Sequence, residues 1–373
     1  MDLTNALAER LPAAWGRVEA LGGEAHAQNL QAALGDRGLL KEVEWLMAVS
    51  PFFAEQLARH GQWVIEQLGT DWLSDRGWTG PQYLSHAQQS VAEPSDDTAF
   101  MAALRQLRGR EMLRMLWRDF SGRGNLEQTL ADVTGLADCT IQLAVNRAES
   151  QVQPRYGRPI GADSGAVQEL VVLGMGKLGG GELNLSSDID LIFTYPESGM
   201  TEGGRSPVTN QEYFIKVGQA VIRYLDAVTV DGFVFRVDMR LRPYGDSGAL
   251  VSSYDALEMY YQEQGREWER YALMKARPIT GGQEATAPLK ALIRSFVFRR
   301  YTDFGVIESL RDMKAMIIAE IRRLGLSQDI KKGRGGIREI EFIAQCLQLI
   351  HGGRLPALQL RGLVPALQAL AAH

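Results

Sequence analysis

Two aspartates separated by a single residue are the strongest chemical signal in the sequence. Asp188 and Asp190 lie in the segment DIDLIFTY, whose apolar and β-branched residues predict a strand over 188–195. Side chains alternate between the two faces of a strand, so both carboxylates are expected on one face and the apolar residues on the other. Two carboxylates this close repel each other, and a bound cation relieves that repulsion. Oxygen ligands of this kind suit Mg²⁺, with Mn²⁺ as the second candidate.

A third carboxylate, Asp238, lies in another β-rich segment and is followed by two arginines. The segment GFVFRVDMRLR predicts a strand over 232–242, in which Asp238, Arg240 and Arg242 share one face. Arginines on the same face can form a fork for an oxyanion. Together with the first aspartate pair, this set fits two-metal phosphoryl or nucleotidyl transfer. In that chemistry the metals stabilise the attacking and leaving oxygens while basic groups hold the others.

A glycine-rich stretch, GMGKLGG, precedes the aspartate pair. Gly174, Gly176 and Gly179 match the G-x-G-x-x-G pattern, but the short segment before the next strand leaves no room for the helix that a dinucleotide-binding fold requires. Lys177 is followed by Leu rather than Ser or Thr, which excludes a P-loop. The stretch instead predicts a turn with free backbone N–H groups. Ser187, directly before the aspartates, is either a phosphate contact or a cap at the entry of the strand.

Helical periodicity dominates on both sides of the β-rich segments. In the helix expected over 100–120, Arg105, Arg108 and Arg110 are predicted to form a solvated basic face opposite an apolar one. The β-rich part begins with a strand at 169–174 and has the order strand, strand, helix, strand. Further helices are predicted over 51–68, 125–148, 209–228, 255–270, 294–324 and 336–351, with a loop over 153–165.

These elements predict an α+β fold that is mostly helical, with a central sheet flanked by helical regions. We expect an N-terminal helical domain over 1–130, a core that carries the sheet over 131–285, and a C-terminal helical region over 286–373.

Composition excludes several classes of protein. The 373 residues include 40 basic and 45 acidic residues, and the net charge of −5 argues against nucleic-acid binding as the main task. Neither a signal peptide nor an apolar run of membrane-spanning length is present, so we expect no membrane association. The two cysteines, Cys139 and Cys346, lie far apart and provide neither a disulfide framework nor metal-ligand spacing. A cytoplasmic protein is therefore expected.

The chemical residues resemble the pattern of the polymerase-β-type nucleotidyltransferases. In that superfamily Gly followed by Gly or Ser precedes an Asp-x-Asp pair, and a third carboxylate lies on a later strand. Gly176, the aspartate pair and Asp238 match this pattern, whereas Lys177 stands where Gly or Ser is usual. Longer segments resemble the N-terminal, adenylyl-removing half of the bacterial bifunctional glutamine synthetase adenylyltransferase/adenylyl-removing enzymes: LGMGKLGGGELNLSSDIDLIF, DGFVFRVDMRLRPYGDSGALV, YYQEQGREWERYALMKARP and GRGGIREIEFIAQCLQLIHGG.

The resemblance implies a polymerase-β-like nucleotidyltransferase core and one half of a longer enzyme. It implies that Asp188, Asp190 and Asp238 are the catalytic metal ligands. Other implied contacts with phosphate or nucleotide are Gly176, Lys177, Gly179, Gly180, Ser187, Arg240 and Arg242, and less directly Lys275, Lys332 and Arg338.

The implied reaction is phosphorolysis of adenylyl-tyrosine on glutamine synthetase, in which adenylyl-protein and phosphate give protein and ADP. The implied partners are adenylylated glutamine synthetase, a PII-type signal protein, ADP or ATP, and phosphate. Two alternatives stay open: an ATP-dependent adenylyltransferase acting on glutamine synthetase, and a non-catalytic module that binds a PII-type protein. The wording GMGKLGG and VDMRLRPYG favours the removing half.

Overall fold

The computed structural model describes residues 5–91, 94–299, 304–325 and 329–373 and divides the chain into two compact units. Unit 1 comprises residues up to Thr140 together with the short segments Asn184–Ser186 and Val228–Val234. Unit 2 comprises Ile141–Leu183, Ser187–Ala227 and Phe235–His373. The boundary between the units falls inside one long helix. The predicted division into three domains stays a prediction.

Unit 1 is helical. Its helices are α1 (Asn5–Ala8), α2 (Leu11–Gly22), α3 (Glu24–Asp36), α4 (Leu40–Val49), α5 (Pro51–Gln67), α6 (Gly80–Val91), α7 (Asp97–Phe120) and the first part of α8 (Leu126–Tyr156). The Ser50 side chain accepts a hydrogen bond from the backbone of Phe53 and caps α5, which confirms the helix expected at 51–68. The core centres on Trp117, whose ring makes edge contacts with Phe53 and Trp72.

The basic side of α7 is not solvated, contrary to the prediction from periodicity. Arg105 is buried and donates to the carbonyl of Gly232, and Arg108 and Arg110 are half-buried. Farther along the helix, Arg114 is fully buried. Its guanidinium donates to Glu111 at 3.1 Å and to Asp132 of α8 at 2.7 Å. Acidic side chains therefore compensate the Arg114 cation in the interior, where a lone charge would be strongly destabilising.

Unit 2 contains all the strands among the described residues. They are β1 (Gly157–Gly161), β2 (Val171–Gly174), β3 (Ile189–Tyr195), β4 (Gly199–Gly203), β5 (Val237–Asp238), β6 (Val251–Ser253) and β7 (Arg277–Pro278). Its helices, besides the end of α8, are α9 (Gly176–Gly180), α10 (Asn210–Asp226), α11 (Tyr254–Glu263), α12 (Glu267–Leu273), α13 (Gln283–Val297), α14 (Phe304–Arg323), α15 (Ile337–His351) and α16 (Leu363–Ala372). Short 3₁₀ turns lie at Gly245–Ser247 and Pro356–Leu358.

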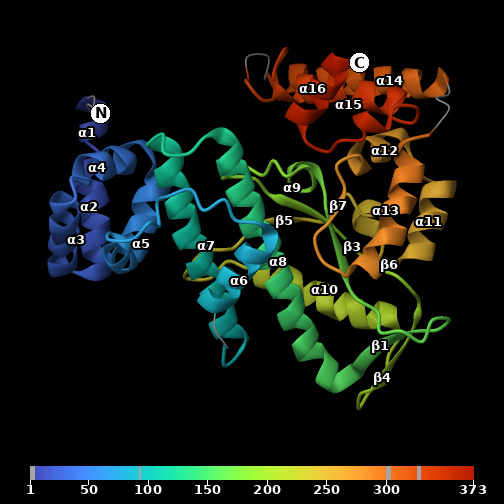
Figure 1. Cartoon of the computed structure of the whole chain (residues 1–373), viewed down its shortest axis with the longest axis horizontal. Coiled ribbons are helices and arrows are strands. Elements are labelled where there is room, and N and C mark those ends of the chain that lie inside the picture. Colours follow the sequence, from blue (N-terminus) through green and yellow to red (C-terminus); the bar gives the residue numbers. More distant parts are fainter. Residues whose placement is uncertain (1–4, 92–93, 300–303, 326–328) are drawn as a thin grey trace. The chain divides into compact units, whose positions relative to one another are not determined.

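The main sheet is mixed and has β3 at its centre. β2 pairs antiparallel with β3 on one side and with β7 on the other. The far edge of β3 is shared, because β5 pairs in parallel with its first residues and β6 in parallel with its last ones. Figure 1 shows these strands in unit 2 next to α10, α11 and α13. The predicted α+β class, mostly helical with a central sheet, is confirmed.

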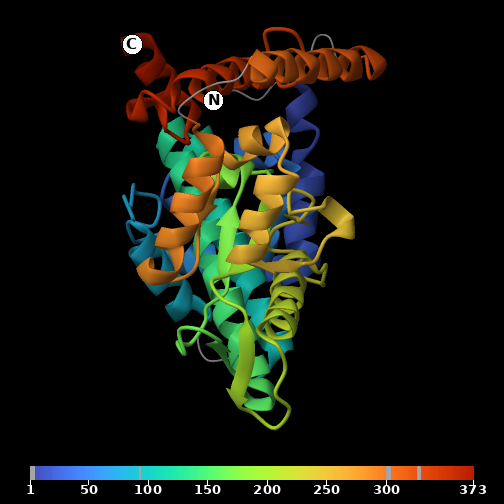
Figure 2. The same ribbon diagram turned by 90° about the vertical axis from the view of Figure 1, so that its right-hand side faces the viewer.

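Helices pack on both faces of this sheet. Phe193 of β3 contacts α10 at Gly218, where a β-carbon would lie 2.8 Å from the Phe193 ring, and Tyr195 stacks on Phe214 of the same helix. The opposite face carries Leu173 and Ile192, which join a core formed with α11, α12 and α13. Figure 2 gives a second view of the sheet with these helices. Both faces of β3 are therefore buried, whereas the sequence predicted apolar residues on one face only.

The strand expected over 232–242 is much shorter, and this expectation was wrong. Only Val237 and Asp238 pair as β5. After that, the Asp238 carboxylate accepts from the backbone and the side chain of Arg240, which bends the chain into a turn. Arg242 therefore does not share a strand face with Asp238.

Two predicted helices also differ from the structure. The helix expected over 255–270 is interrupted between α11 and α12 near Gly265, where a β-carbon would lie 2.5 Å from the carbonyl oxygen of Tyr261. In the range 294–324, two helices, α13 and α14, replace one, and the positions 300–303 lie outside the described residues.

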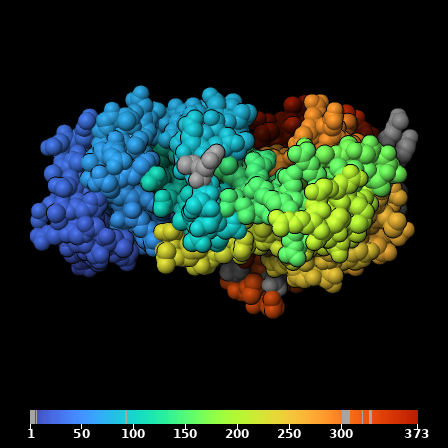
Figure 3. Space-filling model, turned by 90° about the horizontal axis from the view of Figure 1, so that it is seen from below, coloured from blue at the N-terminus to red at the C-terminus, as the bar shows by residue number. Residues whose placement is uncertain are grey.

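A small second sheet was missed by the sequence analysis. β1 and β4 pair antiparallel over their whole length, where a loop was expected at 153–165. Both strands contact α10. In Figure 3 the residues of these strands and of α10, coloured green to yellow-green, form a continuous surface.

No helix among the described residues combines the length and the apolar composition needed to cross a bilayer.

Candidate active site

The three aspartates meet at one end of the main sheet. Asp190 of β3 and Asp238 of β5 are direct partners in the parallel pairing of these strands. Asp188 lies one residue before β3, beside a backbone hydrogen bond from Ile189 to the carbonyl of Arg236. The buried side chains of Ile189 and Leu191 anchor this end of β3 in the core. The structure thus pairs Asp190 with Asp238 and leaves Asp188 just before the start of β3. The role of the three aspartates as metal ligands stays a prediction.

Two arginines pair with two of these aspartates beside a cavity of about 380 Å³, whose lining includes Asp188 and Asp238 but not Asp190. Arg236 forms an ion pair with Asp188, and Arg240 forms one with Asp238. Both guanidinium groups are more than half exposed. The cavity is also lined by Val237, Met239 and Asp246. The cavity therefore combines exposed guanidinium groups, which can contact a phosphate, with carboxylates, which can contact a metal ion.

The electrostatics of the cluster distinguish its aspartates. Burial, followed by the charges of the neighbouring Asp238 and Asp188, raises the pKa of Asp190 to about 6, although the nearby Arg240 opposes this shift. Asp238 differs, because hydrogen bonds from the Arg240 side chain hold its pKa below the usual range. Asp190 is therefore the carboxylate whose ionised form is least compensated by the chain itself.

The donor set has the chemistry of a site for a hard divalent cation. Three carboxylates lie at one strand end, and Gly176 leaves the space beside Asp190 open, since a β-carbon there would lie 2.9 Å from Asp190 Oδ2. Within the described residues, no three Asp, Glu, His or Cys side chains gather closely enough to hold a metal ion as they stand. Asp188 and Asp238 pair with the arginines instead.

The glycine-rich stretch forms the end of β2 and the short helix α9. Gly176 has a positive φ of 52°, which glycine adopts readily. Gly179 packs directly on the backbone: a β-carbon there would lie 2.0 Å from the carbonyl oxygen of Lys275 and 2.4 Å from that of Gly174. At Gly180 a β-carbon would lie 3.1 Å from Glu182 Oε2. Close approach of backbone segments thus explains the second pair of glycines.

Lys275 is buried and links this turn to the C-terminal helices. Its ammonium group donates to Glu182 Oε2 at 3.2 Å and to Glu341 Oε1 of α15 at 2.8 Å. Glu182 also accepts from the backbone N–H of Leu363 at the start of α16. Lys177 is half-buried, and its pKa is lowered by burial and by the nearby Lys331. We call Glu182, Lys275 and Glu341 the lysine bridge.

Ser187 and Arg242 have different surroundings. Ser187 is half-buried next to Asp188, as its predicted place at the strand entry requires. Arg242 donates to the carbonyl of Met239 at 2.8 Å and lies 3.6 Å from Asp246 Oδ1. With a side chain only 12% exposed, Arg242 holds the loop after β5.

Lys332 and Arg338 line a separate pocket between α14 and α15, apart from the residues of the aspartate cavity.

Sequence reasoning missed Arg236 and the two acids of the lysine bridge. Arg236 lies two residues before Asp238, so the same alternation that singled out Arg240 could have found it. Glu182 and Glu341 carry no such signal, because they are 159 positions apart (341 − 182) and meet only through Lys275.

Comparisons with known proteins match the chain to family models and to curated relatives. A family model described as glutamate-ammonia ligase adenylyltransferase matches residues 40–291, and one described as GlnD PII-uridylyltransferase matches residues 311–373. Curated relatives include the bifunctional glutamine synthetase adenylyltransferase/adenylyl-removing enzymes of Pseudomonas aeruginosa, 50% identical over 89% of this chain, and of Pseudomonas putida, 54% identical over 88%. That of Shewanella loihica is 48% identical over 88% of this chain. The chain spans about a third of the length of each of these relatives, 34% in all three.

Proposed function

Because the chain belongs to the glutamate-ammonia ligase adenylyltransferase family, we propose that it removes adenylyl groups from glutamine synthetase. The reaction is phosphorolysis of adenylyl-tyrosine, which yields unmodified protein and ADP. The observation that carries this proposal is the juxtaposition of Asp190 and Asp238 across β3 and β5, with Asp188 and the two exposed arginines beside them. The printed name of the relatives includes an adenylyl-removing activity.

Asp188, Asp190 and Asp238 would hold Mg²⁺, or Mn²⁺ as the second candidate, because carboxylate oxygens are the ligands that these ions prefer. When bound, such an ion supplies positive charge to the phosphoryl oxygens. The unfavourable ionisation of Asp190 in the chain alone fits this role, since a cation compensates its charge.

The cationic side chains of the cavity would bind the substrate oxygens. Arg236 and Arg240 lie at the cavity and present exposed guanidinium groups, the type that binds phosphate in two-point contacts. Lys177, beside the glycine turn, is the further candidate for a phosphate oxygen, and Gly176 admits the phosphate close to Asp190. Gly179, Gly180, Ser187, Lys275 and Arg242 act in this scheme by shaping the turn, the strand entry and the loop.

The bond changes require no histidine base. An oxygen of inorganic phosphate attacks the adenylyl phosphorus, the bond from phosphorus to the tyrosine oxygen breaks, and the phenolate takes up a proton from solvent. Phosphate is already anionic at neutral pH, and a phenol with a pKa of about 10 gives an adequate leaving group. The products are ADP and free tyrosine on the protein.

The same site could run the reaction from ATP, and the printed name of the relatives also includes an adenylyltransferase activity. We favour removal because the segments GMGKLGG and VDMRLRPYG resemble the removing half of these enzymes. The match of residues 311–373 to a PII-uridylyltransferase model supports a PII-type signal protein as a regulatory partner.

Two parallel incubations test the direction. One contains the chain, adenylylated glutamine synthetase, phosphate and Mg²⁺, and the other contains the chain, unmodified glutamine synthetase and labelled ATP. We expect ADP in the first and no label on protein in the second. The variant Asp238→Asn should be inactive in the first, whereas Asp255→Asn, an exposed acid on α11, should retain activity. Label on the protein without ADP release would assign the adenylyltransferase direction.

A further inference from the structure

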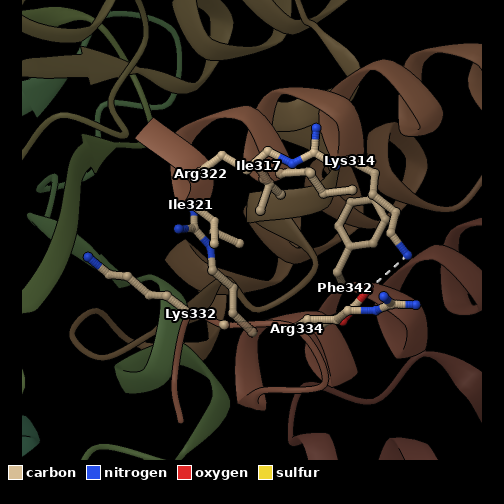
Figure 4. Close-up of a pocket in the computed structure, with 11 residues that line it drawn as sticks. Lys314, Ile317, Ile321, Arg322, Lys332, Arg334 and Phe342 are labelled. Carbon is tan, nitrogen blue, oxygen red and sulfur yellow. Dashed lines mark ion pairs between the residues drawn. The ribbon is translucent and has the colours of Figure 1, made fainter. Parts of the chain in front are cut away.

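The space between α14 and α15 holds a pocket of about 390 Å³ that the proposed reaction does not use. Ile317 and Ile321 of α14 and Phe342 of α15 form an apolar wall, while the loop before α15 closes the pocket with Lys332, Gly333 and Arg334. Figure 4 shows these apolar side chains facing one space, with charged side chains at its margin. The volume falls in the range of about 300–1,000 Å³ that is usual for small-molecule sites.

Positive charge dominates the lining. Five cations contribute to it, namely Lys314, Arg322, Lys332, Arg334 and Arg338. Among the described lining residues Glu339 is the only acid, and it pairs with Lys314 at 3.1 Å. Among the described lining residues, cations therefore exceed acids by four, in a chain whose formal net charge is −5. Such a local excess of cations favours an anionic occupant.

The combination of an apolar wall and several cations defines the class of ligand. Inorganic phosphate would use the cations but leave the isoleucines and Phe342 exposed to water. A purely apolar ligand would leave the arginines without a partner. An organic phosphate with an aromatic or apolar group satisfies both parts of the lining, because the phosphates contact the cations and the organic group covers the apolar wall.

We propose that this pocket is a second binding site, for a nucleotide-like organic phosphate. It is separate from the aspartate cavity, since the two share no lining residue. The pocket and the lysine bridge share helix α15. Arg338, Glu339 and Phe342 of α15 line the pocket, and Glu341 of the same helix pairs with Lys275 beside the glycine turn. The proposal does not depend on the direction or the identity of the reaction.

Calorimetric titration of the whole chain with ADP tests the proposal, and it is carried out in EDTA. Without a divalent cation, the three aspartates repel ADP from the candidate active site. The double variant Lys332→Ala/Arg334→Ala removes two cations of the pocket. The matched control is Lys290→Ala, which removes an exposed cation on α13 outside the pocket.

We expect ADP to bind one site on the chain and inorganic phosphate to bind at least about tenfold more weakly, because phosphate gains nothing from the apolar wall. The double variant should weaken ADP binding by about tenfold or more, since each charge-assisted hydrogen bond contributes on that scale, and Lys290→Ala should not. In hydrogen exchange, ADP should protect 314–342. The proposal would be overturned if ADP did not bind, or if phosphate bound with the same affinity as ADP. It would also be overturned if the double variant bound ADP as tightly as the wild type, or if ADP protected only 174–190 from exchange.

Discussion

Asp190 must be ionised in the proposed reaction, although its surroundings in the chain oppose ionisation. Burial is the first cause of its raised pKa of about 6, and the charges of Asp238 and Asp188 follow. A carboxylate in this position lowers the stability of the folded chain at neutral pH, because the unfolded chain does not impose the same repulsion. The ionised Asp190 side chain thus does not stabilise the fold, which fits a role in the proposed reaction.

Asp190→Asn should therefore stabilise the chain while it abolishes turnover. The amide keeps the volume and removes the repelled charge, so the free energy of unfolding in EDTA at pH 8 should rise by about 1 kcal/mol, after allowance for the partial exposure of the site. Urea unfolding and ADP release measure the two effects. Asp255→Asn, at an exposed acid on α11, is the control and should change neither the free energy of unfolding nor ADP release strongly. A destabilised Asp190→Asn would show that the charge is compensated within the chain.

Glu149 of α8 predicts a pH dependence that is independent of the active site. Burial raises the pKa of Glu149 to about 7, although a backbone hydrogen bond involving Leu170 acts in the opposite direction. The folded chain therefore keeps this proton up to about pH 7, whereas the unfolded chain loses it near 4.5, the ordinary pKa of a glutamate side chain. Because the folded state binds the proton more strongly, this group's stabilisation is lost as the pH rises from about 4.5 to 7.

Glu149→Gln removes this loss. The free energy of unfolding of the variant, minus that of the wild type, should increase by about 1–2 kcal/mol between pH 5 and pH 8. Urea unfolding across this range measures the difference, and Glu127→Gln, an exposed acid on the same helix, serves as the control. A difference that is constant with pH would mean that Glu149 is already ionised in the folded chain at pH 5.

At the scale of elements, α7 shows how far helical periodicity can mislead. Spacing alone placed Arg105, Arg108 and Arg110 on a solvated face, yet Arg105 is buried. Arg114 and Arg118 of the same helix are also buried, and both donate to Asp132 of α8. Glu111, a neighbour on α7, is also buried. Burial would raise its pKa, but the hydrogen bond with His86 and the charges of Arg114 and Arg76 hold it at about 2. Periodicity carries no information about partners on another helix.

Asp132→Ala should destabilise unit 1 strongly. It leaves Arg114 and Arg118 buried without their shared acceptor and removes the acceptor of the Tyr83 hydroxyl. Loss of one partner of a buried ion pair typically costs about 3–5 kcal/mol in the free energy of unfolding. Asp119→Ala, which removes a half-buried acid at the end of α7, should cost much less. A small effect of Asp132→Ala in urea unfolding would mean that water replaces the carboxylate.

The lysine bridge gives a second prediction at this scale. Lys275→Met removes the ammonium group between Glu182 and Glu341, so these acids lose their shared partner while the buried methylenes are replaced. We expect faster hydrogen exchange at 176–183 and in α15, since the turn and the helix are then no longer tied together. Lys290→Met on α13 is the matched control. If Lys275 instead contacts phosphate, the variant would raise the KM for phosphate without any change in exchange at the turn.

The sequence predicted the central strand of the main sheet better than the elements around it. The apolar pattern identified β3, whose residues are almost all buried. Alternation failed beyond Asp238, because the turn formed with Arg240 depends on a local hydrogen bond that competes with extension. Strands β1 and β4, with the sequences GRPIG and GMTEG, contain glycine and proline and lack an alternating pattern, so only their mutual pairing identifies them.

At the scale of the whole molecule, the chain joins a helical unit to a unit that carries the aspartates, the glycine turn and the C-terminal helices. The chain corresponds to about a third of the length of its relatives, 34% for that of Pseudomonas aeruginosa, so the activity of the isolated chain is the decisive question. In the proposed scheme the aspartates alone do not set the direction, because removal and addition of the adenylyl group would both use the metal that they hold. The direction is set by the nucleophile that the site accepts.

The fate of labelled phosphate tests the central claim most directly. The chain is incubated with adenylylated glutamine synthetase, Mg²⁺ and ³²P-labelled inorganic phosphate, and the nucleotides are separated. The account predicts ADP that carries the label in its β-phosphate, in an amount equal to the unmodified tyrosine formed. Label should be absent when Asp188 or Asp238 is replaced by Asn. Release of unlabelled AMP would instead show hydrolysis and contradict the claim that phosphate is the nucleophile.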